Sequence, residues 1–330
     1  MDKRIKPILD ANLNRVTEGL RVIEEYARFI SLNKTDCQHL AKFRRHINQS
    51  NPDIVGHLLV RDIQKDARAK EIPSKRTDIS TLLMANFRRV QEGLRVLEEY
   101  TGDASFSMAR YDMYTLEKTM VLHSLKPRIQ NGIYLISDDI DILLQGLAWG
   151  VSLIQLRDKT GTRKSLLKKA RHIQPLAKKA GIPFIINDYL DIALACDADG
   201  FHTGQEDLPI DTIRQLLGPH KLIGRTTHSI KQGRQAKKEG ADYVSVGPIW
   251  QTPSKPGRKG IGKHYLHHAK TLNIPYVAIG GVDIDNIDTL LPFNPPLIGL
   301  IRDYQNIPEI QKKLKAFSPD NKTHPPQIEN

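Results

Sequence analysis

A cluster of polar residues follows an apolar run near the middle of the chain, and its residue types could bind an anion. Gln155, Arg157 and Lys159 stand at alternate positions directly after the apolar residues 151–154. Side chains of a β-strand repeat every two residues, so an extended segment here points the amide, the guanidinium and the ammonium to one side of a sheet. This spacing predicts a binding site for a negatively charged group.

Two carboxylates stand at the ends of later apolar runs and could bind a divalent cation. Asp188 follows the run at residues 184–186, and Asp207 follows the run at residues 200–203. Mg2+ prefers oxygen ligands and keeps waters or phosphate oxygens in its shell. A lone Asp in such a place often caps a helix instead, and a helix could begin soon after Asp207.

Three cations follow predicted strands in the same part of the chain: Arg157, Lys159 and Lys255. One divalent ion together with several cations suits a diphosphate, and a diphosphate held in this way is a good leaving group. The joint occurrence of these residues with Asp188 and Asp207 favours a Mg2+ site over two separate helix caps.

The elements that must position these side chains alternate between strands and helices. Eight apolar runs predict strands, at residues 133–136, 151–154, 184–186, 200–203, 222–224, 243–246, 276–279 and 297–301. Helical stretches separate many of them, at residues 164–179, 210–217, 230–239, 264–272 and 308–317. This alternation predicts an α/β fold, a (β/α)8 TIM barrel of about 190 residues with its function on the loops after the strands. An open doubly wound sheet is the alternative, and it requires a reversal of strand order that the sequence does not display.

The first part of the chain contains an internal repeat and no predicted strand. Residues 11–26 return as residues 85–100 with twelve of sixteen positions identical. Apolar residues at steps of three and four predict amphipathic helices in both copies. We therefore expect an all-α domain at residues 1–128, the barrel at residues 129–318 and a disordered tail at residues 319–330.

A polar stripe lies beside the apolar face of each copy, with Asn12, Arg15 and Gly19 recurring as Asn86, Arg89 and Gly93. One interpretation is structural: the polar pairs join two related helices while glycine permits close packing. The other is functional, with the two arginines lining a paired anion or nucleotide site. The sequence lacks a phosphate loop of the Gly-x4-Gly-Lys-Ser/Thr type, so the residues alone do not identify a kinase.

Composition and charge limit the classes of protein. The net charge of +12 is spread over both parts of the chain, and no basic arm or zinc finger accompanies it, so we expect no nucleic-acid partner. No apolar stretch approaches the length of a membrane helix, and the N-terminus lacks a secretory signal. Cys37 and Cys196 have no metal or redox spacing. A reducing bacterial-type cytoplasm is the expected setting, and a homo-oligomer is compatible with the sequence.

The residues after the strands resemble those of thiamine phosphate synthase over about residues 130–318. The motifs that carry this resemblance are Gln155-Leu156-Arg157-Asp158-Lys159, Asn187-Asp188, residues 202–207, residues 247–255 and residues 279–282. The resemblance implies a transferase of thiamine biosynthesis that joins hydroxymethylpyrimidine diphosphate to thiazole phosphate, or to its carboxylate, and releases diphosphate. In that family diphosphate departs first, and the thiazole nitrogen then captures the methylene cation.

The resemblance also implies residue roles. It places the pyrimidine near Gln155, and it assigns the diphosphate to Arg157, Lys159, Asn187 and Lys255. It assigns Mg2+ to Asp188 and Asp207. Leu156 and Asp158 belong to the same substrate-binding motif, and Thr226 stands where the family commonly has serine.

The thiazole side follows from two later motifs. The resemblance places Thr252, Pro253 and Ser254 along the thiazole, with Gly281 and the backbone of Ile301 and Arg302 at its phosphate. Residues 252–262 are expected to form a mobile cover that excludes water. Arg302 replaces a residue that is often serine, which makes the phosphate site the part that departs most from the family.

The N-terminal repeat resembles a helical domain that is fused ahead of thiamine phosphate synthase in some bacteria. This resemblance implies phosphorylation of hydroxymethylpyrimidine phosphate, and a dimerisation domain is the alternative. Two other functions stay open for the barrel: a thiazole tautomerase, which needs no diphosphate clamp, and a noncatalytic barrel that senses a phosphate ligand. Two local expectations complete the analysis: His202 is structural, and Lys168 and Lys169 face solvent.

Overall fold

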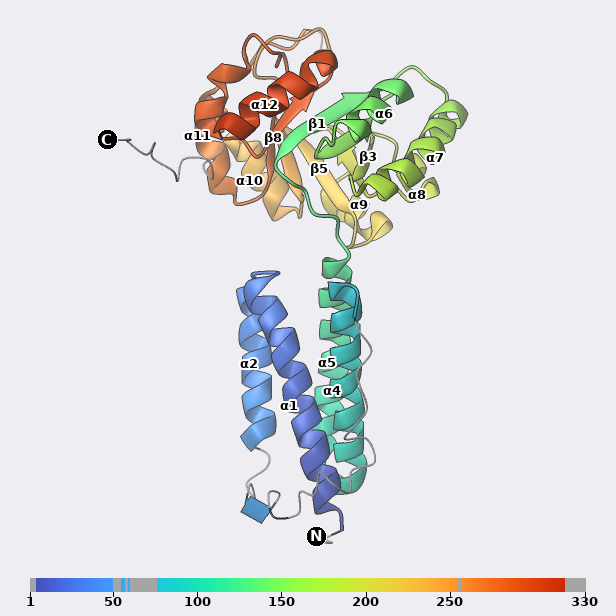
Figure 1. Ribbon diagram of the computed structural model, residues 1–330, viewed down its shortest axis with the longest axis vertical. Helices are drawn as coiled ribbons and strands as arrows, with labels where there is room; N and C mark the ends of the chain where they lie inside the picture. Colours follow the sequence, from blue (N-terminus) through green and yellow to red (C-terminus); the bar gives the residue numbers. More distant parts are fainter. Residues whose placement is uncertain (1–3, 50–54, 57–58, 60–75, 255–256, 318–330) are drawn as a thin grey trace, which may run out of the picture. The chain divides into compact units, whose positions relative to one another are not determined.

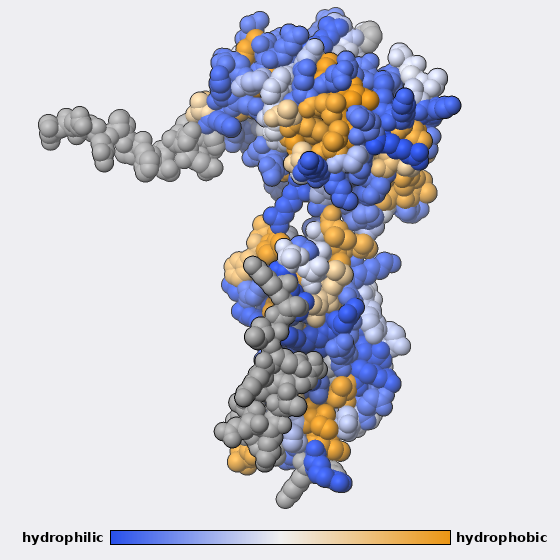
Figure 2. All heavy atoms as spheres, turned by 45° about the vertical axis from the view of Figure 1, so that its right-hand side comes forward, coloured by the Kyte–Doolittle hydropathy of each residue, from blue (hydrophilic) through white to orange (hydrophobic). Residues whose placement is uncertain are grey.

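The computed structural model describes residues 4–49, 55–56, 59, 76–254 and 257–317. The chain divides into two compact units, Met1–Leu125 and Lys126–Asn330. The division lies a few residues before the boundary expected after residue 128. Hydrophilic residues dominate the face shown in Figure 2, and hydrophobic residues appear there in separate patches. None of the described helices is long and apolar enough to cross a membrane.

The first unit is helical in its described part. Its long helices are α1 (Lys6–Phe29), α2 (Lys34–Gln49), α4 (Ile79–Thr101) and α5 (Ala104–Ser124) (Figure 1). Helix α1 packs on α4, while α2 packs on α1 and α5 packs on α4. Asp78 and Asp103 cap α4 and α5 by accepting hydrogen bonds from backbone N–H groups in the first turn. The apolar faces that the sequence predicts form one buried core.

The two repeats meet at α1 and α4, and a glycine in each permits the contact. A Cβ atom on Gly19 would lie 2.7 Å from a Val90 methyl, and one on Gly93 would lie 2.7 Å from a Val16 methyl. Asn12 and Asn86 are buried, and each donates to a backbone carbonyl one turn earlier on its own helix. The glycines of the polar stripe therefore permit close helix packing, as the structural interpretation expects.

The repeat extends into the second helix of each pair. Arg44 on α2 forms an ion pair with Glu24 on α1 (2.9 Å), and Arg110 on α5 forms an ion pair with Glu98 on α4 (3.2 Å). Glu24 and Glu98 occupy equivalent positions in the repeated segment. Each repeat is thus a helical hairpin whose two helices are joined by an equivalent ion pair.

The second unit is a closed barrel of eight parallel strands in sequence order, which confirms the predicted (β/α)8 fold. The strands are β1 (Gly132–Ser137), β2 (Leu153–Leu156), β3 (Phe184–Asn187), β4 (Gly200–Thr203), β5 (Leu222–Thr227), β6 (Tyr243–Val246), β7 (Tyr276–Ile279) and β8 (Leu297–Leu300). Strand β1 pairs with both β2 and β8, and this pairing closes the sheet. The open doubly wound alternative is therefore wrong.

Helices follow most strands and cover the outside of the barrel (Figure 1). They are α6 (Ile140–Ala148), α7 (Arg163–Ala180), α8 (Leu190–Ala195), α9 (Ile210–Leu217), α10 (Ile230–Lys238), α11 (His264–Ala269) and α12 (Ile307–Phe317). Between β7 and β8 two short 3-10 turns, Ile287–Thr289 and Leu291–Phe293, take the place of an α-helix.

Two apolar layers hold the barrel. One lies between the strands and the surrounding helices, where Leu156 and Ile186 are buried. The other fills the barrel interior, where Tyr134, Leu153 and Tyr243 are buried. Because strand side chains alternate, every second residue faces the interior, and the polar residues at the strand ends lie above this inner layer.

Candidate active site

A cavity of about 510 Å3 opens at the carboxyl ends of the barrel strands. Residues from all eight strands or from the loops that follow them line it. It brings together most of the predicted site residues: Gln155, Arg157, Lys159, Asn187, Asp188, Asp207, Thr226, Thr252, Ser254 and Ile301. These residues come from distant parts of the chain, and the barrel places them around one space.

A smaller cavity of about 230 Å3 lies beside the loops after β7 and β8. Pro253, Gly281 and Arg302 line this second cavity, and Thr252, Ser254 and Ile301 line both. Gly281 has a φ of +70°, a conformation that favours glycine, and a Cβ there would lie 2.8 Å from the Cβ of Trp250. The residues predicted for the thiazole side therefore lie around this smaller cavity, and three of them also line the main one.

Asp188 is held in an uncommon backbone conformation at the end of β3. Its φ is +60°, and its backbone N–H donates to the His202 carbonyl at 3.0 Å. The Lys159 ammonium lies 3.5 Å from the Asp188 carboxylate, across the gap between two neighbouring strands. A left-handed aspartate at a cavity is a form of strain that commonly marks a functional position.

Asp207 closes the turn that follows β4. Its Oδ2 atom accepts a hydrogen bond from the Gly204 N–H at 2.6 Å and from the Thr203 hydroxyl at 3.2 Å. Both contacts use the same carboxylate oxygen. Asp207 therefore closes this turn and does not cap the next helix, whose N-cap is Pro209, and it also lines the main cavity.

The donors at this cavity suit a hard cation that is only partly enclosed by protein. No three His, Cys, Asp or Glu residues come close enough to hold a metal by themselves anywhere in the described ranges. Asp188 and Asp207 would supply two carboxylates, and Mg2+ commonly completes such a shell with waters and substrate phosphates. The residues present therefore fit this cation.

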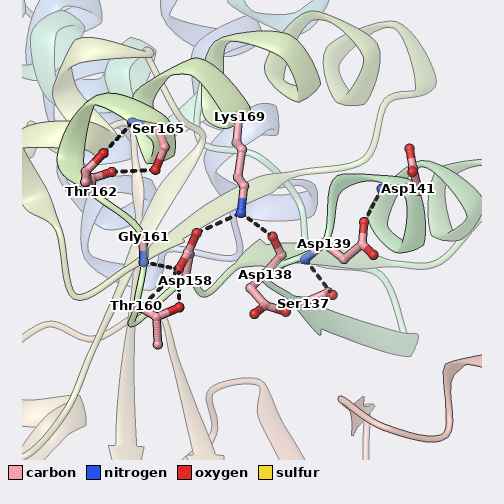
Figure 3. Close-up of polar contacts among 10 residues, drawn as sticks. All are labelled: Ser137, Asp138, Asp139, Asp141, Asp158, Thr160, Gly161, Thr162, Ser165 and Lys169. Carbon is pink, nitrogen blue, oxygen red and sulfur yellow. Dashed lines mark hydrogen bonds and ion pairs between the residues drawn. The ribbon is translucent and has the colours of Figure 1, made fainter.

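Asp158 does not line either cavity, and its carboxylate instead holds the loop between β2 and α7 (Figure 3). It accepts hydrogen bonds from the N–H groups of Thr160 (3.1 Å) and Gly161 (2.7 Å), and the Lys169 ammonium lies 2.7 Å away. Lys169 also donates to the carbonyl of Asp138 at 2.9 Å. The Lys169 hydrogen bond, supported by the two backbone N–H groups and opposed by burial, lowers the pKa of Asp158 to about 2.

Two expectations need correction on this geometry. Leu156 is buried between the barrel and its helices, so it packs and does not line the cavities. Lys169 does not simply face solvent, because it pairs with the buried Asp158. Lys255 and the predicted tail at residues 319–330 lie outside the described residues.

The structure also adds cavity residues that the sequence did not single out. They are Tyr134, Ser245, His228 and Arg258, and the predicted structural residue His202 joins them. Arg258 lies in the glycine-rich and basic segment after β6, which is where a sequence signal for it was present. The sequence did not indicate that Tyr134 lines the cavity, because an aromatic residue within an apolar strand is usually part of the hydrophobic core.

Each of the two units matches a known protein family. The family model described as "Thiamine monophosphate synthase" matches residues 131–301, and the one described as "ThiD2 family" matches residues 7–119. A thiamine-phosphate synthase of Thermosynechococcus vestitus is 38% identical over 317 residues, which cover 91% of this chain and 90% of the relative. One of Nostoc sp. is 39% identical over 316 residues, with coverage of 89% and 88%.

A solved structure resembles the barrel unit. The thiamine phosphate pyrophosphorylase from Pyrococcus furiosus superposes with a TM-score of 0.52 at 27% sequence identity. The match covers 58% of this chain and 98% of that protein. The similarity is thus confined to one part of this chain, whereas the relatives from Thermosynechococcus and Nostoc match it over nearly its whole length.

Proposed function

The chain belongs to the thiamine-phosphate synthase family, a family of transferases, and we propose that its barrel joins hydroxymethylpyrimidine diphosphate to thiazole phosphate or its carboxylate. One observation carries the proposal: three carboxylates and three cationic side chains line a single cavity at the carboxyl ends of the strands. The carboxylates are Asp188, Glu206 and Asp207, and the cations are Arg157, Lys159 and Arg258. A tautomerase has no need for this combination, which suits a diphosphate.

The diphosphate would lie between the carboxylates and the cations. Asp188 and Asp207 would hold Mg2+, which would neutralise charge on the diphosphate oxygens as they leave. Arg157 and Lys159 would contact the same oxygens from the end of β2, and the buried Asn187 amide would donate to them from β3. Preorganised donors of this kind stabilise charge that develops in the transition state.

Bond breaking would precede bond making in this site. The carbon–oxygen bond to diphosphate breaks first, and the thiazole nitrogen then donates its electron pair to the methylene cation of the pyrimidine. Gln155 would orient the pyrimidine on the cavity floor, and residues 252–262 would exclude water from the cation. Thr226 would donate its hydroxyl proton to the diphosphate or the pyrimidine.

The smaller cavity would hold the phosphate of the thiazole substrate. The Gly281 backbone approaches it without a side chain, and Arg302 lies on its wall. A guanidinium can bind a phosphate through two parallel hydrogen bonds. Arg302 would therefore take over part of the phosphate binding that a serine supplies elsewhere in the family.

Mass spectrometry after incubation with both substrates and Mg2+ tests the coupling reaction. Asp188→Asn is the informative variant, because asparagine tolerates the left-handed backbone of this position while it removes the charge. Asp211→Asn is the matched control on the exposed first turn of α9. We expect thiamine phosphate from the wild type and from Asp211→Asn, and a loss of at least about 100-fold in Asp188→Asn, as for other losses of electrostatic stabilisation.

Other outcomes would favour the alternatives. A folded wild type that binds the phosphorylated substrates without forming product would contradict coupling and support a phosphate-sensing barrel. Conversion of one thiazole isomer into another without coupling would support a tautomerase. Equal activity of Asp188→Asn and the wild type would contradict the Mg2+ site.

For the helical unit we propose phosphorylation of hydroxymethylpyrimidine phosphate, which would supply the barrel's substrate. The match of residues 7–119 to the ThiD2 family supports this proposal. Incubation of the full chain with ATP, Mg2+ and the pyrimidine monophosphate should yield ADP and the diphosphate. Arg15→Ala and Arg89→Ala should reduce this yield if the exposed arginines contact phosphate, and unchanged yields would show that these arginines have no such role.

A further inference from the structure

Five side chains form a continuous hydrogen-bonded chain across the floor of the main cavity. We call this chain the relay. The Gln155 Nε2 atom donates to the Tyr134 hydroxyl at 2.6 Å, and the Tyr134 and Tyr243 hydroxyls lie 2.9 Å apart. The Tyr243 hydroxyl lies 3.1 Å from His202 Nδ1, and His202 Nε2 lies 3.0 Å from the Thr226 hydroxyl. The relay thus connects β2 with β5 through the barrel interior.

The side chains of the relay are buried, although both ends reach the cavity. Tyr243 is fully buried, Tyr134 and Gln155 are 1% exposed, His202 is 7% exposed and Thr226 is 9% exposed. Burial raises the pKa of both phenols, so each stays protonated and has one proton to donate. A buried polar group without a hydrogen bond lowers the stability of the fold, so burial favours the intact relay.

A glycine on β5 provides the space for the central link. A Cβ atom on Gly224 would overlap the Tyr243 phenol and would lie 2.5 Å from His202 Nδ1. The Tyr243 and His202 rings lie 5.6 Å apart between centroids in a tilted arrangement. The backbone of β5 therefore leaves room for the contact between these two side chains.

The hydroxyls and the imidazole can each donate or accept, and the Gln155 amide starts one continuous direction through them. The Gln155 amide nitrogen can only donate, so Tyr134 accepts this bond, and its own O–H donates to Tyr243. Tyr243 then donates to His202 Nδ1, and the tautomer that fits this direction carries a proton on Nε2. His202 Nε2–H donates to Thr226, whose own proton is left for the cavity.

Both ends of the relay line the cavity, and this direction gives them opposite characters. At the β2 end, one N–H of the Gln155 amide donates to Tyr134, and the carbonyl oxygen is left as an acceptor. At the β5 end, the Thr226 hydroxyl offers a proton. A reversed amide would reverse every link, so that Gln155 would offer N–H groups and Thr226 would offer a lone pair.

We propose that Tyr134, Tyr243 and His202 are positioning residues that lock the Gln155 amide and the Thr226 hydroxyl in this one polarity. The cavity then selects a ligand with an amino group toward β2 and an anionic oxygen toward β5, which describes a phosphorylated aminopyrimidine. This inference rests on the proposed function and specifies how that same site distinguishes an amino substituent from a carbonyl. None of the three positioning residues needs to react for this selection to operate.

Calorimetric titration of two inert ligands tests the relay. Both are pyrimidine diphosphate analogues with a non-transferable methylene link, and they differ only in carrying an amino group or a carbonyl at the same ring position. We expect the wild type to bind the amino ligand at least tenfold more tightly. Tyr243→Phe, which cuts the relay at its centre, should lower this preference about tenfold, which equals about 1.4 kcal/mol.

Tyr276→Phe is the matched control. Tyr276 is also a buried phenol of a barrel strand, but its hydroxyl finds no hydrogen-bond partner within the described residues. Its loss should leave the preference for the amino ligand unchanged. Tyr134→Phe cuts the relay at a different link and gives a second variant if Tyr243→Phe fails to fold.

The outcomes separate the relay from the coupling reaction. An unchanged preference in folded Tyr243→Phe or Tyr134→Phe would overturn the relay, and a wild type that prefers the carbonyl ligand would overturn its polarity. A wild type that prefers the amino ligand, loses the preference in Tyr243→Phe and yet forms no thiamine phosphate would support the relay and contradict the proposed coupling.

Discussion

Replacing Asp158 with asparagine should weaken the barrel by an amount that depends on pH. Asparagine has nearly the same shape and can still accept the backbone N–H bonds of Thr160 and Gly161, but it cannot pair with Lys169. The folded state lowers the pKa of Asp158 from 3.8 to about 2. This difference corresponds to about 2 kcal/mol of stability at neutral pH. The Asp158 side chain is 4% exposed but its partner Lys169 is 31% exposed, so solvent screening makes this figure an upper value.

The sign of the pH dependence follows from the lowered pKa. Stability from the ionised carboxylate is fully present above the unfolded pKa and is lost as the pH falls toward the folded value. Asp158→Asn should therefore be less stable than the wild type by about 2 kcal/mol at pH 7 and by about 1 kcal/mol at pH 3.

Urea unfolding followed by tryptophan fluorescence measures this difference in the barrel alone. The chain has two tryptophans, Trp149 and Trp250, and both lie in the second unit. Lys169→Met should lose a similar amount at pH 7. Lys168→Met is the matched control, because that neighbouring lysine is exposed and should change stability by less than about 0.5 kcal/mol.

Two results would refute this reasoning. One is an Asp158→Asn variant as stable as the wild type at pH 7. The other is a stability difference of the same size at pH 7 and pH 3, because a difference that does not titrate cannot arise from the charge of Asp158.

Three further predictions concern other parts of the chain. Gly93→Ala should destabilise the helical unit by about 1 to 2 kcal/mol in calorimetry, because overpacking against Val16 outweighs the gain in helix propensity; greater stability would contradict the close packing. Tyr276→Phe should stabilise the barrel by up to about 1 kcal/mol in urea unfolding, since its buried hydroxyl lacks a partner in the described part of the chain. Arg258→Ala should raise the KM for the pyrimidine diphosphate about tenfold at similar kcat, as loss of one charged contact implies; an unchanged KM would place Arg258 outside the diphosphate site.

The barrel could be predicted because strand and helix periodicities alternate along the sequence. The residues at which each strand begins and ends were harder to predict. Strand β2 begins at Leu153 and includes Gln155, whereas the apolar run predicted a strand at residues 151–154. Gly150 has a φ of +66°, and the chain turns there before it enters the strand. Gln155 therefore lies inside the barrel, where its amide can reach Tyr134.

Contacts between distant residues could not be predicted from local patterns. Tyr134 and Tyr243 are 109 residues apart, and each reads as an apolar strand residue until the closed barrel brings their hydroxyls together. Asp158 belongs to a recognised motif with Arg157 and Lys159, yet its carboxylate serves the loop that presents them. A motif identifies which segment forms the site, whereas the direction of each side chain depends on the folded loop.

The paired hairpins of the helical unit imply a history of duplication. Gly19 and Gly93 occupy matching places on the two sides of one contact, which is the arrangement of a two-fold symmetric dimer. A shorter ancestral chain with one hairpin could have paired with a second copy of itself through this surface. Fusion would then free the two halves to diverge: Arg44 and Arg110 form equivalent ion pairs, while the next residues, Arg45 and Tyr111, differ.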